Sequence, residues 1–166
     1  MILVHTIISG GQTGVDRAAL DAAADLGLKR GGMAPAGWRA EDGVVPEHYR
    51  LGMMQSASEA YPVRTQANVE ASGGTLILSL GPLPADSGSM LTGKLARRIG
   101  KPYRWFTLPF GPLGVQLVRE WLEENRIEIL NVAGPRESRE PGVHAAARRA
   151  LVEILSPDAD GFGWSP

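Results

Sequence analysis

A glycine-rich segment near the start of the chain has the composition of an anion-binding loop. Its sequence, Ser9-Gly10-Gly11-Gln12-Thr13-Gly14, joins an apolar β-branched run to a helical stretch that begins Val15-Asp16-Arg17. Glycines at such a junction let backbone N–H groups approach an anion, and the helix start adds a positive partial charge. The segment is not a Walker A loop, because no lysine follows its glycines. We expect phosphate binding here, the alternative being a tight turn without a ligand.

A second junction, over residues 86–94, also offers groups that bind anions. Asp86-Ser87-Gly88-Ser89 and Thr92-Gly93-Lys94 supply hydroxyls, backbone amides and a cation. We take Ser89 and Thr92 as candidates for ligand contact. The alternative is that Lys94, Arg97 and Arg98 form only a solvated helix face.

Three other segments carry polar residues that suit a ligand. Glu41 and Asp42 are adjacent carboxylates in a loop, able to orient a ribose, hold a metal ion through water or cap a turn. Arg64 and Asn68 are four residues apart, so they share one face of a helix and could contact a ligand or each other. Arg136 follows a Gly-Pro turn, which needs no ligand to explain it.

Several other chemistries lack the residues that they need. The chain has no cysteine, which excludes disulfides, thiol nucleophiles and cysteine-held zinc or iron–sulfur clusters. His5, His48 and His144 are scattered rather than spaced as metal ligands, so we expect no metal site. The Gly-x-Ser-x-Gly motif of serine hydrolases is missing.

The composition is that of a globular protein. Of 166 residues, 43% are hydrophobic and 21% are charged, as in ordinary folded domains. The net charge of −1 is a poor match for nucleic acid, so we expect no nucleic-acid partner. Because there is no 18-residue apolar run and the first apolar stretch is short, we expect no membrane span, no signal peptide and a cytoplasmic protein.

Hydrophobic periodicity predicts the elements that position the candidate residues. Strands are expected at Ile2–Ser9, Leu28–Met33, Gly74–Leu80, Tyr103–Leu108 and Ile127–Val132. Helices are expected at Val15–Leu26, Thr92–Ile99, Pro112–Asn125 and Pro141–Leu155. This alternation predicts a parallel sheet covered by helices on both faces, with ligands bound beyond the carboxyl ends of the strands. We predict one domain over residues 1–156 and a C-terminal tail over residues 157–166.

Five segments together resemble the putative molybdenum carrier family. They read GGQTGVDRAALDAA, AEDG, RTQANV, SGGTLILS and NVAGPRES, and the resemblance runs from about Ile7 to Leu155. This family belongs to the SLOG superfamily, which also includes the LOG phosphoribohydrolases. The resemblance implies an α/β Rossmann-like three-layer sandwich with a mostly parallel central sheet. It also implies a nucleotide-like ligand and a homo-oligomer, a dimer or tetramer, and the family name implies carriage of the molybdenum cofactor.

The resemblance also implies roles for individual residues. It places the phosphate loop at Gly10, Gly11, Thr13 and Gly14, and it places around the pocket Asp16, Arg17, Glu41, Asp42, Arg64, Asn68 and Thr92. The candidate ligand-binding set is completed by Gln12, Ser89 and Arg136.

The chain departs from its relatives at two positions. Gly73 stands where an Asp is usual, and Leu78 stands where LOG enzymes have the Glu of their Pro-Gly-Gly-x-Gly-Thr-x-x-Glu segment. The favoured hypothesis is therefore a binding protein, a cofactor carrier or a nucleotide sensor, that holds a small phosphorylated ligand. The alternative is a LOG-like phosphoribohydrolase that releases the base from nucleoside 5′-monophosphates, with Glu41 or Asp42 as the catalytic carboxylate.

Overall fold

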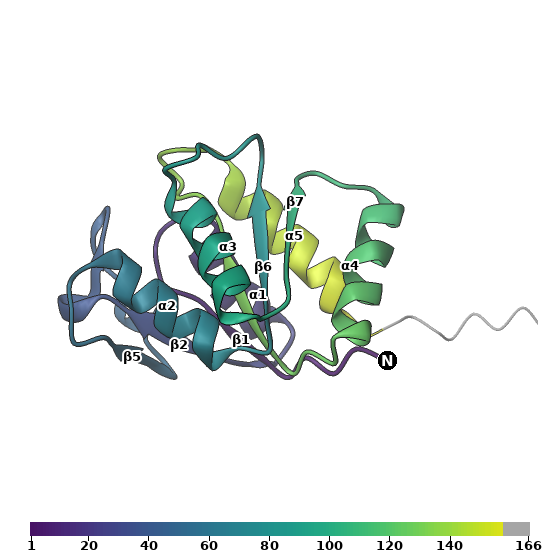
Figure 1. Ribbon diagram of the computed structural model, residues 1–166, viewed down its shortest axis with the longest axis horizontal. Helices are drawn as coiled ribbons and strands as arrows, with labels where there is room; N and C mark the ends of the chain where they lie inside the picture. Colours follow the sequence, from purple (N-terminus) through teal and green to yellow (C-terminus); the bar gives the residue numbers. More distant parts are fainter. Residues whose placement is uncertain (158–166) are drawn as a thin grey trace, which may run out of the picture.

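The computed structural model describes residues 1–157, which form three layers with a parallel sheet in the centre (Figure 1). The strands of this sheet are β1 (Thr6–Ile8), β2 (Lys29–Ala34), β5 (Met53–Gln55), β6 (Gly74–Ser79), β7 (Tyr103–Thr107) and β8 (Ile129–Ala133). The helices are α1 (Val15–Asp25), α2 (Tyr61–Ala71), α3 (Gly88–Ile99), α4 (Pro112–Glu124) and α5 (Val143–Leu155). Helices α1, α4 and α5 cover one face of the sheet, and α2 and α3 cover the other. The predicted α/β Rossmann-like sandwich is confirmed.

The strand order is β5-β2-β1-β8-β6-β7, and every adjacent pair in it is parallel. The chain builds outward from β1 to β2 and β5 on one side, and from β6 to β7 on the other. β8 then returns to lie between β1 and β6. Such a reversal leaves a crevice beyond the carboxyl ends of the central strands, where α/β proteins bind ligands.

The core explains why the central elements form. Every residue of β6 is buried, as expected of a strand that has neighbours on both sides and helices on both faces. Ala18, Ala19, Ala22 and Ala23 of α1 are fully buried, and these small side chains let α1 pack closely against α5 and the sheet.

Four features differ from the sequence-based expectations. Strand β5 and the full length of α2 were not predicted. Helix α3 begins at Gly88 rather than Thr92, because Ser87 caps it by accepting a hydrogen bond from the Met90 N–H at 3.1 Å. The loop expected around Glu41 and Asp42 contains a short antiparallel hairpin, formed by β3 (Arg39–Ala40) and β4 (Gly43–Val44).

Two expectations concern the membrane and the end of the chain. Among residues 1–157, none of the helices combines the length and the apolar character needed to cross a bilayer. Residues 158–166, most of the expected C-terminal tail, lie outside the described residues.

Candidate ligand-binding site

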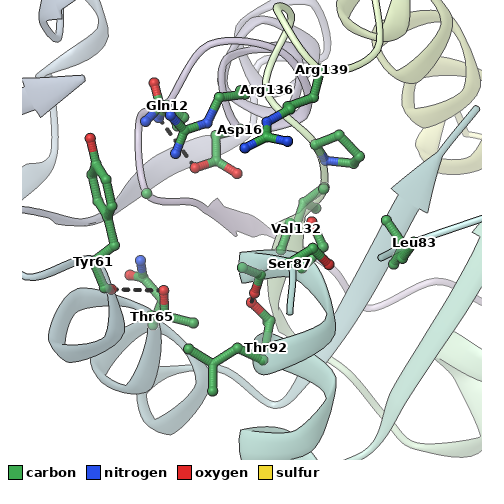
Figure 2. A pocket seen from close by; sticks show the side chains of 18 of the residues that line it. Gln12, Asp16, Tyr61, Thr65, Leu83, Ser87, Thr92, Val132, Arg136 and Arg139 are labelled. Carbon is green, nitrogen blue, oxygen red and sulfur yellow. Dashed lines mark hydrogen bonds between the residues drawn. The ribbon is translucent and has the colours of Figure 1, made fainter. Parts of the chain in front are cut away.

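A cavity of about 610 Å³ lies at the carboxyl ends of β1, β6 and β8 (Figure 2). Its walls come from four parts of the chain: the glycine-rich loop with the start of α1, helix α2, the β6–α3 connection with the start of α3, and the segment after β8. The cavity brings together these predicted ligand residues: Gly10, Gln12, Asp16, Arg64, Asn68, Ser89, Thr92 and Arg136.

A buried ion pair joins α1 to α2 in one wall. The Arg64 Nη1 donates to Asp16 Oδ2 at 3.0 Å, and the Gln12 N–H donates to the same oxygen at 3.2 Å. Burial raises the pKa of the Asp16 carboxyl above its usual range, while the charge of Arg64 acts in the opposite direction. Asp16 is therefore a carboxyl group whose charge depends on its partners in the cavity.

The start of α3 forms the opposite side of the cavity, where Figure 2 shows Ser87 and Thr92. The first amides of a helix have no partner within the helix. Ser89 is 7% exposed, and its hydroxyl makes no hydrogen bond within residues 1–157. The carboxylate of Glu140 holds the preceding connection by accepting from the Leu80 N–H at 2.7 Å and the Gly81 N–H at 3.1 Å.

Cationic side chains line the cavity across from the start of α3. Arg136 and Arg139 come from the segment after β8 and line the cavity with Arg64 (Figure 2). The guanidinium carbons of Arg64 and Arg136 lie 5.6 and 5.5 Å from the centre of the Tyr61 ring. The Arg139 side chain has neither a hydrogen bond nor an ion pair with any described residue. The lining also contains the carboxyl groups of Asp16, Asp86 and Glu140, so Arg139 is the cation of the cavity that is open to an anionic group of a ligand.

The other predicted ligand residues do not line the cavity, and their contacts hold the surrounding loops together. These residues are Gly11, Thr13, Gly14 and Arg17. Arg17 is 8% exposed, and its guanidinium donates to Asp42 at 2.6 and 2.8 Å and to the Gly11 carbonyl at 3.1 Å. It thereby ties the glycine-rich loop to the β3–β4 hairpin.

The adjacent carboxylates also lie outside the cavity lining. The hydrogen bonds from Arg17 lower the pKa of the Asp42 carboxyl below its usual range. Glu41 accepts hydrogen bonds from the hydroxyls of Thr13 and Ser138. Burial opposes ionisation of Glu41, but these hydrogen bonds outweigh it and lower its pKa. Both groups are thus ionised and already engaged in connecting loops.

The glycine-rich loop uses several of its amides within the protein. The Gln12 N–H donates to Asp16, the Thr13 N–H donates to Gln12 Oε1 at 3.1 Å, and the Val15 N–H donates to the Pro135 carbonyl at 3.2 Å. A Cβ atom at Gly14, whose φ is 78°, would lie 2.3 Å from the Pro135 oxygen. Gly14 therefore lets the arginine-bearing segment after β8 pack against the loop.

Tyr61, Ser87 and Arg139 also line the cavity, although they were not selected from the sequence. Arg139 lies three residues after Arg136, so the charge of that segment was the signal available. Tyr61 gave no signal because α2 was not predicted at full length. Within residues 1–157, no three His, Asp or Glu side chains are placed to hold a metal ion.

The fold and this cavity define a Rossmann-like α/β protein with a polar site, lined in part by arginines, at the carboxyl ends of its central strands. Residues 7–155 match the circularly permuted YpsA SLOG family, and the chain belongs to that family. It is similar to a solved structure from Syntrophus aciditrophicus that is named a putative molybdenum carrier protein. The two share 38% sequence identity with a TM-score of 0.82, over 93% of this chain and 94% of the other. No curated protein matches the chain.

Proposed function

We propose that this protein binds a small phosphorylated, nucleotide-like ligand, either the molybdenum cofactor or a nucleotide, and carries or senses it. The observation that carries the proposal is that three arginines face the hydroxyl-rich start of α3 across one cavity. Its volume of about 610 Å³ is in the range that holds small ligands. The name of the relative from Syntrophus supports the carrier form of the proposal.

The phosphate group is proposed to sit at the start of α3. There the N–H groups of Gly88 and Ser89 and the unpartnered Ser89 hydroxyl can donate to it, and Arg139 can neutralise its charge. The glycine-rich loop is the weaker candidate for this role, because the Gln12, Thr13 and Val15 amides already have partners. In this arrangement the glycine-rich loop contacts the other end of the ligand.

The binding role is tested by comparing two arginine variants by calorimetry with adenosine 5′-monophosphate. Arg139→Gln removes a cation from the cavity, and Arg104→Gln removes an exposed arginine from β7. Loss of a charged hydrogen bond predicts a roughly tenfold or greater rise in Kd for Arg139→Gln, with no change for Arg104→Gln. Equal affinities for the two variants would place the phosphate elsewhere.

A proton NMR spectrum of the protein with adenosine 5′-monophosphate, followed for several hours, separates binding from hydrolysis. Broadened ligand lines without free adenine support a binding protein. Adenine release would make the protein a phosphoribohydrolase. Sharp, unchanged lines would rule out this nucleotide, and a pterin phosphate would be the next ligand tested.

A further inference from the structure

We infer that Gln12 and Asp16 recognise the heterocycle of the ligand. The side-chain amino group of Gln12 donates to an acceptor atom of the ring, and the Asp16 carboxylate accepts from a ring N–H group beside that atom. The inference rests on the proposed function and specifies the group bound at the end of the cavity opposite α3. The matching chemical class is a cyclic amide or amidine, as in a nucleobase or a pterin.

The side-chain amide of Gln12 is held in one orientation. Its Oε1 accepts from the Glu41 N–H at 2.9 Å and from the Thr13 N–H at 3.1 Å. A backbone N–H can only donate, so both contacts require an oxygen at this position. The amino group Nε2 must therefore point away from these two N–H groups.

That amino group has no partner. Gln12 is 5% exposed, and Nε2 is fully buried without a hydrogen bond. Only one other side-chain polar atom within residues 1–157 is as completely buried and lacks a partner, and it is Nε of Arg64, which also lines this cavity. Buried donors without acceptors are rare in folded proteins. Their occurrence together in one wall indicates that a bound ligand supplies the missing acceptor.

Asp16 provides an acceptor in the same wall of the cavity. Its Oδ2 accepts from the Gln12 backbone N–H and from Arg64, which fixes the position of the carboxylate. Figure 2 shows the carboxylate of Asp16 directed into the cavity. A carboxylate has about four lone-pair positions, so it can also accept from an N–H of the ligand.

The two proposed ends of the site lie on opposite sides of the cavity. Asp16 lies in one wall, while Ser87 and Thr92 lie across the cavity (Figure 2). Tyr61 also lines the cavity, but three guanidinium groups already lie 5.2 to 5.6 Å from the centre of its ring, so the ring serves to hold these cations. The proposed site therefore has a phosphate end at α3 and a ring end at Gln12 and Asp16.

The test is calorimetry with probes that contain or lack a ring, namely adenosine and guanosine 5′-monophosphates, a pterin monophosphate and ribose 5-phosphate. Gln12→Glu keeps an oxygen for the two backbone donors but replaces the NH₂ group with an acceptor. We expect it to raise Kd for the preferred ring-bearing probe at least tenfold more than Kd for ribose 5-phosphate. Gln55→Glu is the matched control, because Gln55 Oε1 also accepts a backbone N–H, at 2.7 Å from Gly37, but lies outside the cavity.

The outcomes distinguish this inference from the proposed function. If Gln12→Glu changes Kd equally for the ring-bearing probes and for ribose 5-phosphate, the inference alone is overturned. The inference alone is also overturned if the wild type binds no ring-bearing probe more tightly than ribose 5-phosphate. A wild type that binds none of the four probes would refute the proposed function as well. If Gln12→Glu does not melt cooperatively, Gln12→Met, which removes the donor without adding charge, is used for the same comparison.

Discussion

Arg64 Nη1 lies 3.0 Å from Asp16 Oδ2, and the two side chains are 12% and 7% exposed. This pair connects α2 to α1 across the wall of the cavity. Each group depends on the other, because burial of an unpaired charge is costly.

Arg64→Met should lower the free energy of unfolding by about 3 kcal/mol at pH 7, because it leaves the Asp16 carboxylate buried without its cation. The loss should be smaller at pH 5, where a carboxyl of raised pKa takes up a proton more readily. Urea unfolding at both pH values measures this loss in the free energy of unfolding. Arg104→Met on exposed β7 is the control, and a loss below about 1 kcal/mol for Arg64→Met would contradict the prediction.

Gly10→Ala should break the same ion pair. A Cβ atom at Gly10 would lie 1.0 Å from Arg64 Nη1 and 2.9 Å from Asp16 Oδ2, so the guanidinium must leave. Because the effect acts through Arg64, the substitution should be at least about 1 kcal/mol less costly in an Arg64→Met background. A double-mutant cycle in urea measures this coupling, and additive effects would disprove it. Gly81→Ala, whose Cβ meets no atom within 4 Å, is the control.

The Arg17–Asp42 pair should make stability depend on acidic pH. Arg17 lowers the pKa of folded Asp42, so the pair stabilises the protein fully above the unfolded pKa of about 3.9. The stabilisation is lost as the pH falls through the lower folded pKa. Wild type should therefore be more stable than Asp42→Asn at pH 6, and the difference should shrink toward pH 3. Urea unfolding of both proteins from pH 3 to pH 6 measures this difference in stability. A difference that stays constant across the range would contradict the prediction.

Asn68→Leu should weaken the attachment of α2 to β2. Asn68 is 4% exposed, and its amide accepts from the Met33 N–H at 2.7 Å and donates to the Met33 carbonyl at 3.0 Å. Loss of both bonds should cost about 2 kcal/mol and speed hydrogen exchange at the Met33 amide. Gln66→Leu, on the exposed side of α2, should do neither. Unchanged exchange at Met33 would show that the two bonds are dispensable.

The elements that sequence could predict are those with a strong hydrophobic pattern. β6 is a continuous apolar run, and α1 has an alanine face, so both were predicted within one residue of their observed ends. β5 has three residues, of which Met54 is 66% exposed, and α2 buries only Asn68 and Val69. Neither has a periodicity that distinguishes it from a loop.

The candidate site was predictable as a set of loops but not as a set of side-chain directions. Asp16 and Arg17 are consecutive, yet Asp16 lines the cavity and Arg17 turns to the β3–β4 hairpin. Likewise, the glycines at 11 and 14 suggest a phosphate loop, but Gly14 is explained by its contact with Pro135. Such choices depend on how distant segments pack, which one sequence does not contain.

Because β8 is the last strand within residues 1–157 but lies between β1 and β6, the sheet closes only after the other five strands have been synthesised. Until residues 129–140 leave the ribosome, a growing chain has a gap in the middle of its sheet and lacks the wall that carries Arg136 and Arg139. A nascent chain that ends before these residues therefore has no complete pocket.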